Sequence, residues 1–404
     1  MIDDELQVLG SKIKKQEHSE PQINFISNHD YDSKKKFSWG CGLFAFLLSI
    51  LIVYILISLF SNVPSQENEK ATTIIPKLQE TVDSLLDKKM SQIDALQGQV
   101  IIMEVKTGDI LAWSGRSRTF DGKTQPCNNC NYQQEQGTLM SPVSLLALLE
   151  TREIELSELI DTGNGVWEYN GYFIKDHNWR RGGYGKIPLG MALEVGSDVA
   201  ITKAVTQVFN CKEERYFELL RKMSIGEIDS IYGMSDFKPM TFNYPKNRNV
   251  LKQHMLINSI GIEGEMAPIQ MLTFYNAIAN NGIMIKPKLK KGSISIINPQ
   301  IASKSNIEKI QNTLWKVANE GLVNKPDYKL EQAAGMFSHI VVNTIVGEDN
   351  INEYHVAFCG YYPAFNPKYS IIVSMNKLGF PASGGGMAAP LFYDIIEKMI
   401  NEQY

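Results

Sequence analysis

The sequence has almost no net charge and few cysteines, and each shortage excludes a class of protein. Its 404 residues carry 40 basic and 44 acidic side chains, so the formal net charge is only −4. A nucleic-acid-binding protein needs a basic face, and this composition therefore indicates no nucleic-acid partner. Five cysteines are too few to cross-link a chain of this length. What is present is ordinary globular composition, 44% hydrophobic and 10% aromatic, which suffices for one large domain or two small ones.

One segment lacks charge altogether, since residues 37–60 contain no acidic or basic side chain. A helix of that length crosses a hydrocarbon core of about 30 Å, and it pairs its own backbone polar groups, as lipid requires. A buried core helix is rarely apolar on every side over such a length. A cleaved signal peptide is disfavoured because its apolar region is shorter and no small-residue cleavage pattern follows in 61–68. The segment is therefore predicted to be a single transmembrane helix.

The charges that flank this segment predict its orientation. Lys34, Lys35 and Lys36 stand directly before it, and acidic or neutral residues dominate after it. By the positive-inside rule, residues 1–36 form a polar, disordered cytoplasmic tail and residues 61–404 lie outside the cytoplasm.

Cys127 and Cys130 form the one close cysteine pair of the outer part. An oxidising compartment favours a short-loop disulfide between them, and two free thiols remain the alternative. A redox pair would open a helix, whereas Pro126 and two asparagines indicate a loop. A zinc site would need a second ligand pair, which the sequence does not offer, so no metal and no cofactor is predicted.

The order of elements in the outer part predicts an α+β fold. Residues 61–75 are a linker, and apolar residues at helical spacing predict a helix over 76–96, either packed on the domain or forming a dimerising coil. Strands are predicted at 99–105 and 110–114, and again near the end of the chain at 353–361 and 369–375. The middle, about 140–280, is mostly helical by its period, and a last helix covers 391–400. Strands from both chain ends with helices between them predict an antiparallel sheet with a helical subdomain.

Five stretches in this order resemble the transpeptidase domain of penicillin-binding proteins. They are the opening hairpin Val100–Ala112, a helix after the middle motif at Ser259–Met271, its continuation Tyr275–Gly282 on to Pro287, a strand pair at Phe358–Ser370, and Gly384–Pro390 at the start of the last helix. The resemblance covers most of 98–400 and is nearest to the class B type, which implies an antiparallel sheet flanked by helices over 98–404. It also implies bacterial peptidoglycan synthesis, with the chain in the inner (cytoplasmic) membrane and its domain in the periplasm. Only the linker and stalk helix, 61–97, fill the place of the pedestal domain that such proteins carry.

The first catalytic motif of that family, a Ser-x-x-Lys at a helix start, aligns with Gly137–Pro142. Thr138 then stands at the nucleophile position and Ser141 at the lysine position. In the family the serine attacks the substrate and the lysine helps to remove its proton. Thr138 is more crowded than serine, and Ser141 is no base near neutral pH. Thr138 is better interpreted as a helix N-cap, a role that threonine performs well.

The second motif, Ser-x-Asn, aligns with Gly196, Ser197 and Asp198. Gly196 replaces the serine and Asp198 the asparagine, while Ser197 occupies the variable middle position. Without the family's chemistry, the stretch is interpreted as a turn or helix start that Asp198 caps.

The third motif, Lys-Thr-Gly, aligns with Met336, Phe337 and Ser338. The cation and the hydroxyl that bind the substrate carboxylate in the family are therefore missing, and Phe337 adds bulk where the strand must approach substrate. His339 follows and is interpreted as plain surface. The literal Lys106–Gly108 sequence falls in the turn of the opening hairpin and is not this motif.

The three altered motif segments, 137–142, 196–198 and 336–338, are called the three corners below. Their changes on a retained framework predict a non-catalytic pseudo-transpeptidase, which keeps the fold and lacks the reaction. It would be a membrane-anchored scaffold or regulator of cell-wall synthesis or division, beside an active penicillin-binding protein or a glycan polymerase. One alternative is an active D,D-transpeptidase or carboxypeptidase that uses Thr138 or Ser141 with a base from elsewhere. Another is a module that binds stem peptide or protein without chemistry.

Overall fold

The computed structural model describes residues 71–404 apart from 236, 238–241, 243, 245–246, 324–331 and 346–350. The predicted tail, 1–36, and the predicted membrane helix, 37–60, lie outside these residues. Within the described part of the chain, no helix is both long and apolar enough to cross a membrane.

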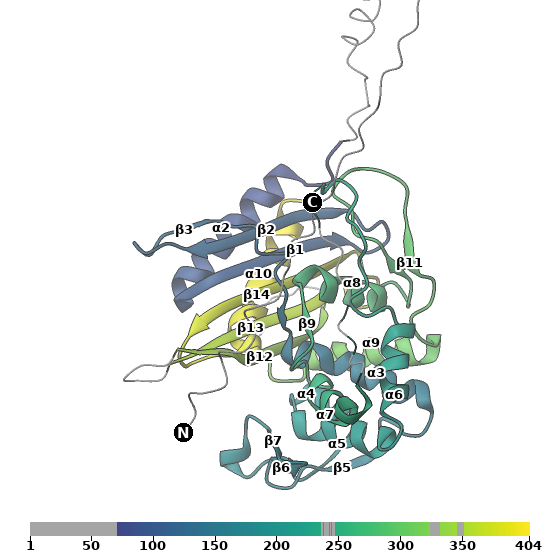
Figure 1. Ribbon diagram of the computed structural model, residues 1–404. Helices are drawn as coiled ribbons and strands as arrows, with labels where there is room; N and C mark the ends of the chain where they lie inside the picture. The colour runs from purple at the N-terminus through teal and green to yellow at the C-terminus, as the bar shows by residue number, and fades with distance from the viewer. Residues whose placement is uncertain are drawn as a thin grey trace, which may run out of the picture. The chain divides into compact units, whose positions relative to one another are not determined.

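A six-stranded antiparallel sheet is the centre of the fold, with strand order β12-β13-β14-β1-β2-β3. The register places Val100 opposite Val373 and Met336 opposite Cys359. Both chain ends thus build one sheet, as the sequence predicts (Figure 1). The strands are β1 (Ala95–Glu104), β2 (Ile110–Arg118), β3 (Thr124–Pro126), β12 (Ala334–Ile345), β13 (Ile351–Tyr362) and β14 (Tyr369–Leu378).

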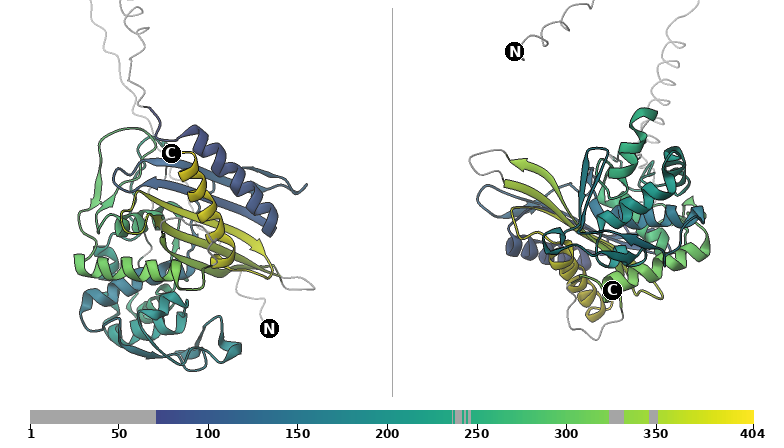
Figure 2. Two further views of the ribbon diagram at one scale, coloured as in Figure 1. Left: turned by 180° about the vertical axis from the view of Figure 1, so that it is seen from behind. Right: turned by 90° about the horizontal axis from the view of Figure 1, so that it is seen from below.

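Two helices, α2 (Pro76–Ile93) and α10 (Ala389–Asn401), cover one face of the sheet, as Figure 2 shows. Helix α2 is the predicted stalk helix. Its apolar stripe is buried in the domain core. The prediction that this helix packs on the domain is therefore confirmed, and the same stripe is not exposed to form a dimerising coil. The stripe consists of Leu78, Val82, Leu86 and Met90. The helix ends at Asp94, which adopts the left-handed conformation with φ 58°, and β1 follows directly. The domain therefore begins ahead of residue 98.

The opposite face of the sheet is covered by α8 (Pro268–Ala279), every residue of which is buried. Beyond it lie the helical subdomain and its short strand pairs, seen at the lower part of Figure 1. The remaining helices are η1 (Gly137–Met140), α3 (Ser141–Thr151), η2 (Trp179–Arg181), α4 (Met191–Glu194), α5 (Asp198–Phe209), α6 (Glu213–Lys222), α7 (Arg248–Asn258), α9 (Lys304–Asn319) and η3 (Gly384–Ala388). The short strands are β4 (Gln134–Glu135), β5 (Leu159–Asp161), β6 (Val166–Tyr169), β7 (Tyr172–Lys175), β8 (Lys186–Pro188), β9 (Glu265–Met266), β10 (Met284–Ile285) and β11 (Ile296–Asn298).

Candidate functional site

The three predicted motif corners meet in space, although they are far apart in the sequence. The Thr138 hydroxyl in η1 donates a hydrogen bond of 2.7 Å to the backbone carbonyl of Phe337 in β12. A Cβ atom placed on Gly196, between α4 and α5, would lie 3.1 Å from the Phe337 ring. Phe337 of the third motif therefore contacts both other motifs: its backbone carbonyl accepts from Thr138 of the first, and its ring packs against Gly196 of the second.

The conformation around Thr138 follows from Gly137. Gly137 has φ 55°, and a Cβ there would lie 2.4 Å from both Ser338 Oγ and Ile340 Cγ2 of β12. Only glycine allows that approach without strain. The chain then forms the 3₁₀ turn η1 and continues into α3, for which Met140 is the N-cap. The interpretation of Thr138 as a helix cap is therefore wrong, because its hydroxyl is bonded to the neighbouring strand instead.

Ser141 stands where the family's lysine is expected. It is buried, and its hydroxyl has no hydrogen-bond partner among the described residues. In that part of the chain, neither Thr138 nor Ser141 has a lysine, histidine or carboxylate within hydrogen-bond reach. A hydroxyl becomes a nucleophile at neutral pH only when a base or a lowered pKa activates it, so this geometry offers no activation.

The second corner is organised by Ser197 and by Asp176, a residue that the sequence did not single out. Ser197 caps α5 by accepting a hydrogen bond of 3.0 Å from the Ala200 amide. Its hydroxyl donates toward Asp176, with contacts of 3.0 and 2.9 Å to the two carboxylate oxygens, and Asp176 also accepts from the Val199 amide at 2.9 Å. The prediction that Asp198 caps this helix is therefore wrong, because the preceding serine does so.

Asp198 is the first residue of α5 and is partly buried. Its Oδ1 atom has no hydrogen-bond partner among the described residues. Burial, with a smaller contribution from the negative charge of Asp176, raises the pKa of Asp198 to about 8. A carboxyl group with that pKa is protonated at neutral pH, so it resembles in charge and shape the asparagine expected there.

The third corner is filled by side chains. Met336 and Ser338 are fully buried in the sheet, and Ser338 Oγ has no partner among the described residues. Phe337 is only 7% exposed because its ring packs against Gly196. Gly384, at the start of the last helix, lies so close to Ser338 that a Cβ would stand 2.2 Å from the Ser338 carbonyl oxygen. Phe337 and Ser338 of β12 are therefore both covered by neighbouring segments.

His339 is half-buried, so its interpretation as plain surface is wrong. Burial lowers the pKa of His339, and burial together with the nearby His339 lowers the pKa of His177. His177 Nε2 lies 3.0 Å from the Tyr184 hydroxyl. Both imidazoles are consequently neutral at pH 7, and neither replaces the missing cation.

Two further sequence interpretations are decided by the structure. The literal Lys106–Gly108 motif lies in the turn between β1 and β2, where the Lys106 ammonium donates to the Asn280 side chain at 2.9 Å. Cys127 and Cys130 are free thiols in this structure, which is one of the two alternatives that the sequence leaves open. The Cys130 thiol is buried and donates to the Ser114 carbonyl, 3.2 Å away. Burial raises the pKa of Cys130 well above its usual range.

The packing of Gly196 against Phe337 predicts a coupled pair of substitutions. We expect Gly196→Ser to cost about 2 kcal/mol of unfolding free energy, about half from the left-handed backbone and half from contact with the ring. In a Phe337→Thr background the ring contact is absent, so the same substitution should cost about 1 kcal/mol less. The measurement is a double-mutant cycle in chemical denaturation.

Gly163→Ser is the matched control for this cycle. Gly163 has φ 55° and no atom within 4 Å of a built Cβ, so it reports the backbone cost alone. Equal costs for Gly196→Ser in both backgrounds would show that the ring does not occupy this corner.

Comparison with known proteins agrees with this architecture. A sequence profile of the penicillin binding protein transpeptidase domain matches residues 98–397. The peptidoglycan D,D-transpeptidase FtsI of Buchnera aphidicola is 22% identical over 351 residues, which cover 84% of this chain and 59% of that protein. PbpB of Mycolicibacterium smegmatis is 23% identical, over 74% of this chain and 49% of its own length. The chain thus spans half to three fifths of these relatives.

A solved structure gives the same fold. The transpeptidase domain of penicillin-binding protein 3 from Burkholderia pseudomallei superposes with a TM-score of 0.68 at 19% identity, covering 83% of this chain and 97% of that one. The sheet with helices on both faces and a helical subdomain therefore defines a transpeptidase fold. The chain belongs to the penicillin binding protein transpeptidase domain family, as its sequence resemblance predicts.

Proposed function

We propose that this protein is a non-catalytic member of its family, a pseudo-transpeptidase that serves peptidoglycan synthesis as a membrane-anchored scaffold or regulator. The observation that carries the proposal is the Phe337 ring, which packs against Gly196 where two motif corners meet. In an active member these corners hold a nucleophile, a lysine and a carboxylate-binding strand. Here the corresponding positions hold Thr138, whose hydroxyl is bonded to a carbonyl, the apolar Met336, and Ser141, whose hydroxyl has no partner in the part of the chain that the structure describes.

An active enzyme with an atypical nucleophile has less support. Thr138 or Ser141 would need a base within about 3 Å, and the described residues supply none. Asp198 is the carboxyl group of the second motif, but its pKa of about 8 leaves it protonated at neutral pH. Loss of such activating groups costs several powers of ten in rate.

A module that binds stem peptide without chemistry is also less favoured. Such a module would keep an open, partly polar cleft along β12. Phe337 is instead nearly buried, and Met336 is fully buried. The retained fold is then best explained by contacts of its outer surface with other proteins of the synthesis machinery, of which an active penicillin-binding protein or a glycan polymerase is the proposed partner.

We further propose the topology that the sequence indicates: a cytoplasmic tail over 1–36, one membrane helix over 37–60 and the domain in the periplasm. Inner-membrane anchorage would place the domain beside membrane-bound synthases. This anchorage would not depend on catalysis at the three corners.

The direct functional test is release of D-alanine from a peptide that ends in D-alanyl-D-alanine. The full chain should release no more D-alanine than its own Thr138→Val/Ser141→Ala variant, which lacks both hydroxyls but keeps similar side-chain volumes. Release that is faster in the unmodified chain, and lost in this variant, would establish the active-enzyme alternative.

A further inference from the structure

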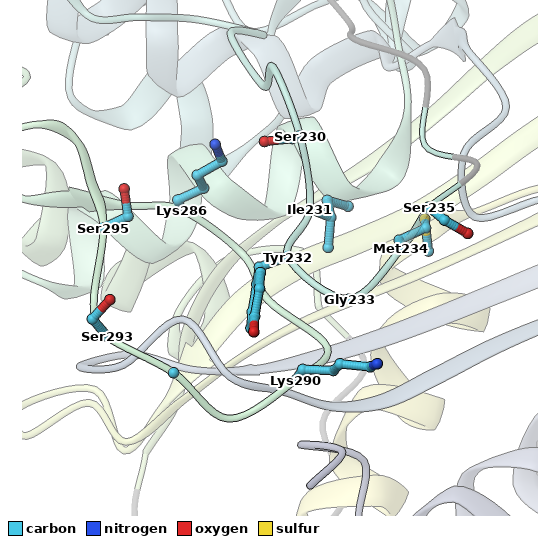
Figure 3. A pocket seen from close by; sticks show the side chains of 11 residues that line it. Ser230, Ile231, Tyr232, Gly233, Met234, Ser235, Lys286, Lys290, Ser293 and Ser295 are labelled. Carbon is cyan, nitrogen blue, oxygen red and sulfur yellow. The ribbon is translucent and has the colours of Figure 1, made fainter. Parts of the chain in front are cut away.

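A second feature of the domain lies away from the three corners, between the segments Ser230–Ser235 and Lys286–Ser295. They enclose a pocket of about 610 Å³. Its lining includes two lysines, Lys286 and Lys290, and hydroxyl groups of one tyrosine and four serines, but no carboxylate. Figure 3 shows the Lys286 side chain extending toward Ser230. In the same view, Ser293 and Ser295 lie on a neighbouring segment, and the Tyr232 ring lies between Ser293 and Lys290. Ammonium and hydroxyl donors with no carboxylate among the lining residues suit an anion. Asp229, which contacts Lys286 and Ser230, lies outside the lining.

The charges around this pocket leave a positive excess. Lys286 pairs with the exposed Asp229 at 2.6 Å. Lys288 and Lys291 share one buried carboxylate, that of Asp109, at 3.3 and 2.5 Å. The Lys290 ammonium has no ion pair or hydrogen bond among the described residues. Four lysines between 286 and 291 are therefore balanced by two carboxylates.

Two isoleucines that flank the lining residue Ser295 in the chain are exposed. Ile294 and Ile296 are 52% and 55% exposed, and Tyr232 is 45% exposed. A site for a free inorganic anion would gain nothing from isoleucines in water. Exposed apolar side chains beside basic ones are instead typical of surfaces that lie at a lipid interface, where the apolar groups enter the headgroup region.

The pocket is also tied to the point where the chain enters the domain. The Lys291 amide donates to the Ala71 carbonyl at 2.8 Å, and the Thr73 amide donates to the Leu289 carbonyl at 2.9 Å. On the other side, the Leu289 amide donates to the Tyr232 carbonyl at 2.7 Å. The predicted membrane helix ends at residue 60, and residues 61–70 reach at most about 35 Å when fully extended. The pocket is thus kept within reach of the membrane surface that the sequence predicts.

We propose that this pocket binds the phosphate of an anionic phospholipid headgroup, with Lys290 and Lys286 as its cations and Ile294 and Ile296 inserted beside it. The contact would fix the orientation of the domain on the outer leaflet. It uses no residue of the three corners, so it is independent of whether the protein is catalytic.

The test is amide hydrogen exchange of the full chain reconstituted in vesicles. One preparation contains only phosphatidylcholine, and the other contains phosphatidylcholine and phosphatidylglycerol in equal parts. We expect exchange in 230–235 and 286–295 to be about fivefold slower with the anionic lipid, the effect of roughly one lysine near such a surface. Lys290→Glu should remove this protection, and Ile294→Ser/Ile296→Ser should weaken it.

Lys186→Glu is the matched control, since Lys186 is an exposed lysine in β8 outside the pocket, and it should leave the protection unchanged. Exchange in β1 and β14 reports whether each variant is folded. Equal exchange in the two vesicles, or protection that survives Lys290→Glu in a folded chain, overturns the proposal. Protection by inorganic phosphate added to phosphatidylcholine vesicles also overturns it, because the ligand would then be a free anion rather than lipid.

Discussion

Asp198→Asn is expected to stabilise the protein at pH 8 by several kcal/mol, while leaving its stability near pH 4 unchanged. The residue is partly buried, its Oδ1 atom has no hydrogen-bond partner among the described residues, and burial raises the pKa of the carboxyl group from its usual 3.8 to about 8. Below both values the group is protonated in the folded and unfolded chains and has no effect. Between them the unfolded chain loses the proton and the folded chain keeps it, so stability falls by about 1.4 kcal/mol per pH unit. Asparagine does not titrate, so it removes this loss.

The measurement is chemical denaturation of wild type and variant from pH 4 to pH 9. The difference between the two should grow up to about pH 8 and then level off. Asp161→Asn, at an exposed carboxylate, is the control and should give a curve parallel to that of wild type. Parallel curves for Asp198→Asn as well would show that Asp198 is ionised in the folded state and that the corner keeps a charged group.

Phe337→Ala is expected to lower the unfolding free energy by about 3–5 kcal/mol, the usual cost of removing a buried aromatic ring. The ring is 7% exposed and packs against Gly196. Denaturation of the full chain measures the change, and Phe365→Ala is the control because that ring is 80% exposed. A loss of the same small size for both variants would mean that the Phe337 ring does not fill the corner.

Most of the framework could be predicted from the sequence because its signals are local. The strands at both chain ends show their apolar runs and turn residues, and the period of 76–96 identifies a helix. The sequence could not decide what covers that helix, because Leu86 and Met90 pack against Gly98 of β1, and the position of that strand depends on the whole fold. The family resemblance supplied the order of the three motifs, which no periodicity reveals.

The contacts of the site could not be predicted, because they join residues far apart in the chain. The bond from Thr138 to the Phe337 carbonyl links residues 199 positions apart. Asp176 carries no motif, yet it orients Ser197. In the sequence, Gly196 and Phe337 are two unrelated departures from the family's motifs. Only the structure shows that the Phe337 ring packs against Gly196.

The most direct test of the lost reaction is the intact mass of the full chain after long incubation with excess β-lactam. Acylation in this family adds the mass of the β-lactam to one hydroxyl. We predict an unchanged mass, because Thr138 is bonded to a carbonyl and Ser141 has no hydrogen-bonded base among the described residues. An added β-lactam mass located by peptide mapping at Thr138 or Ser141 would contradict the proposal that this protein keeps the fold without the chemistry.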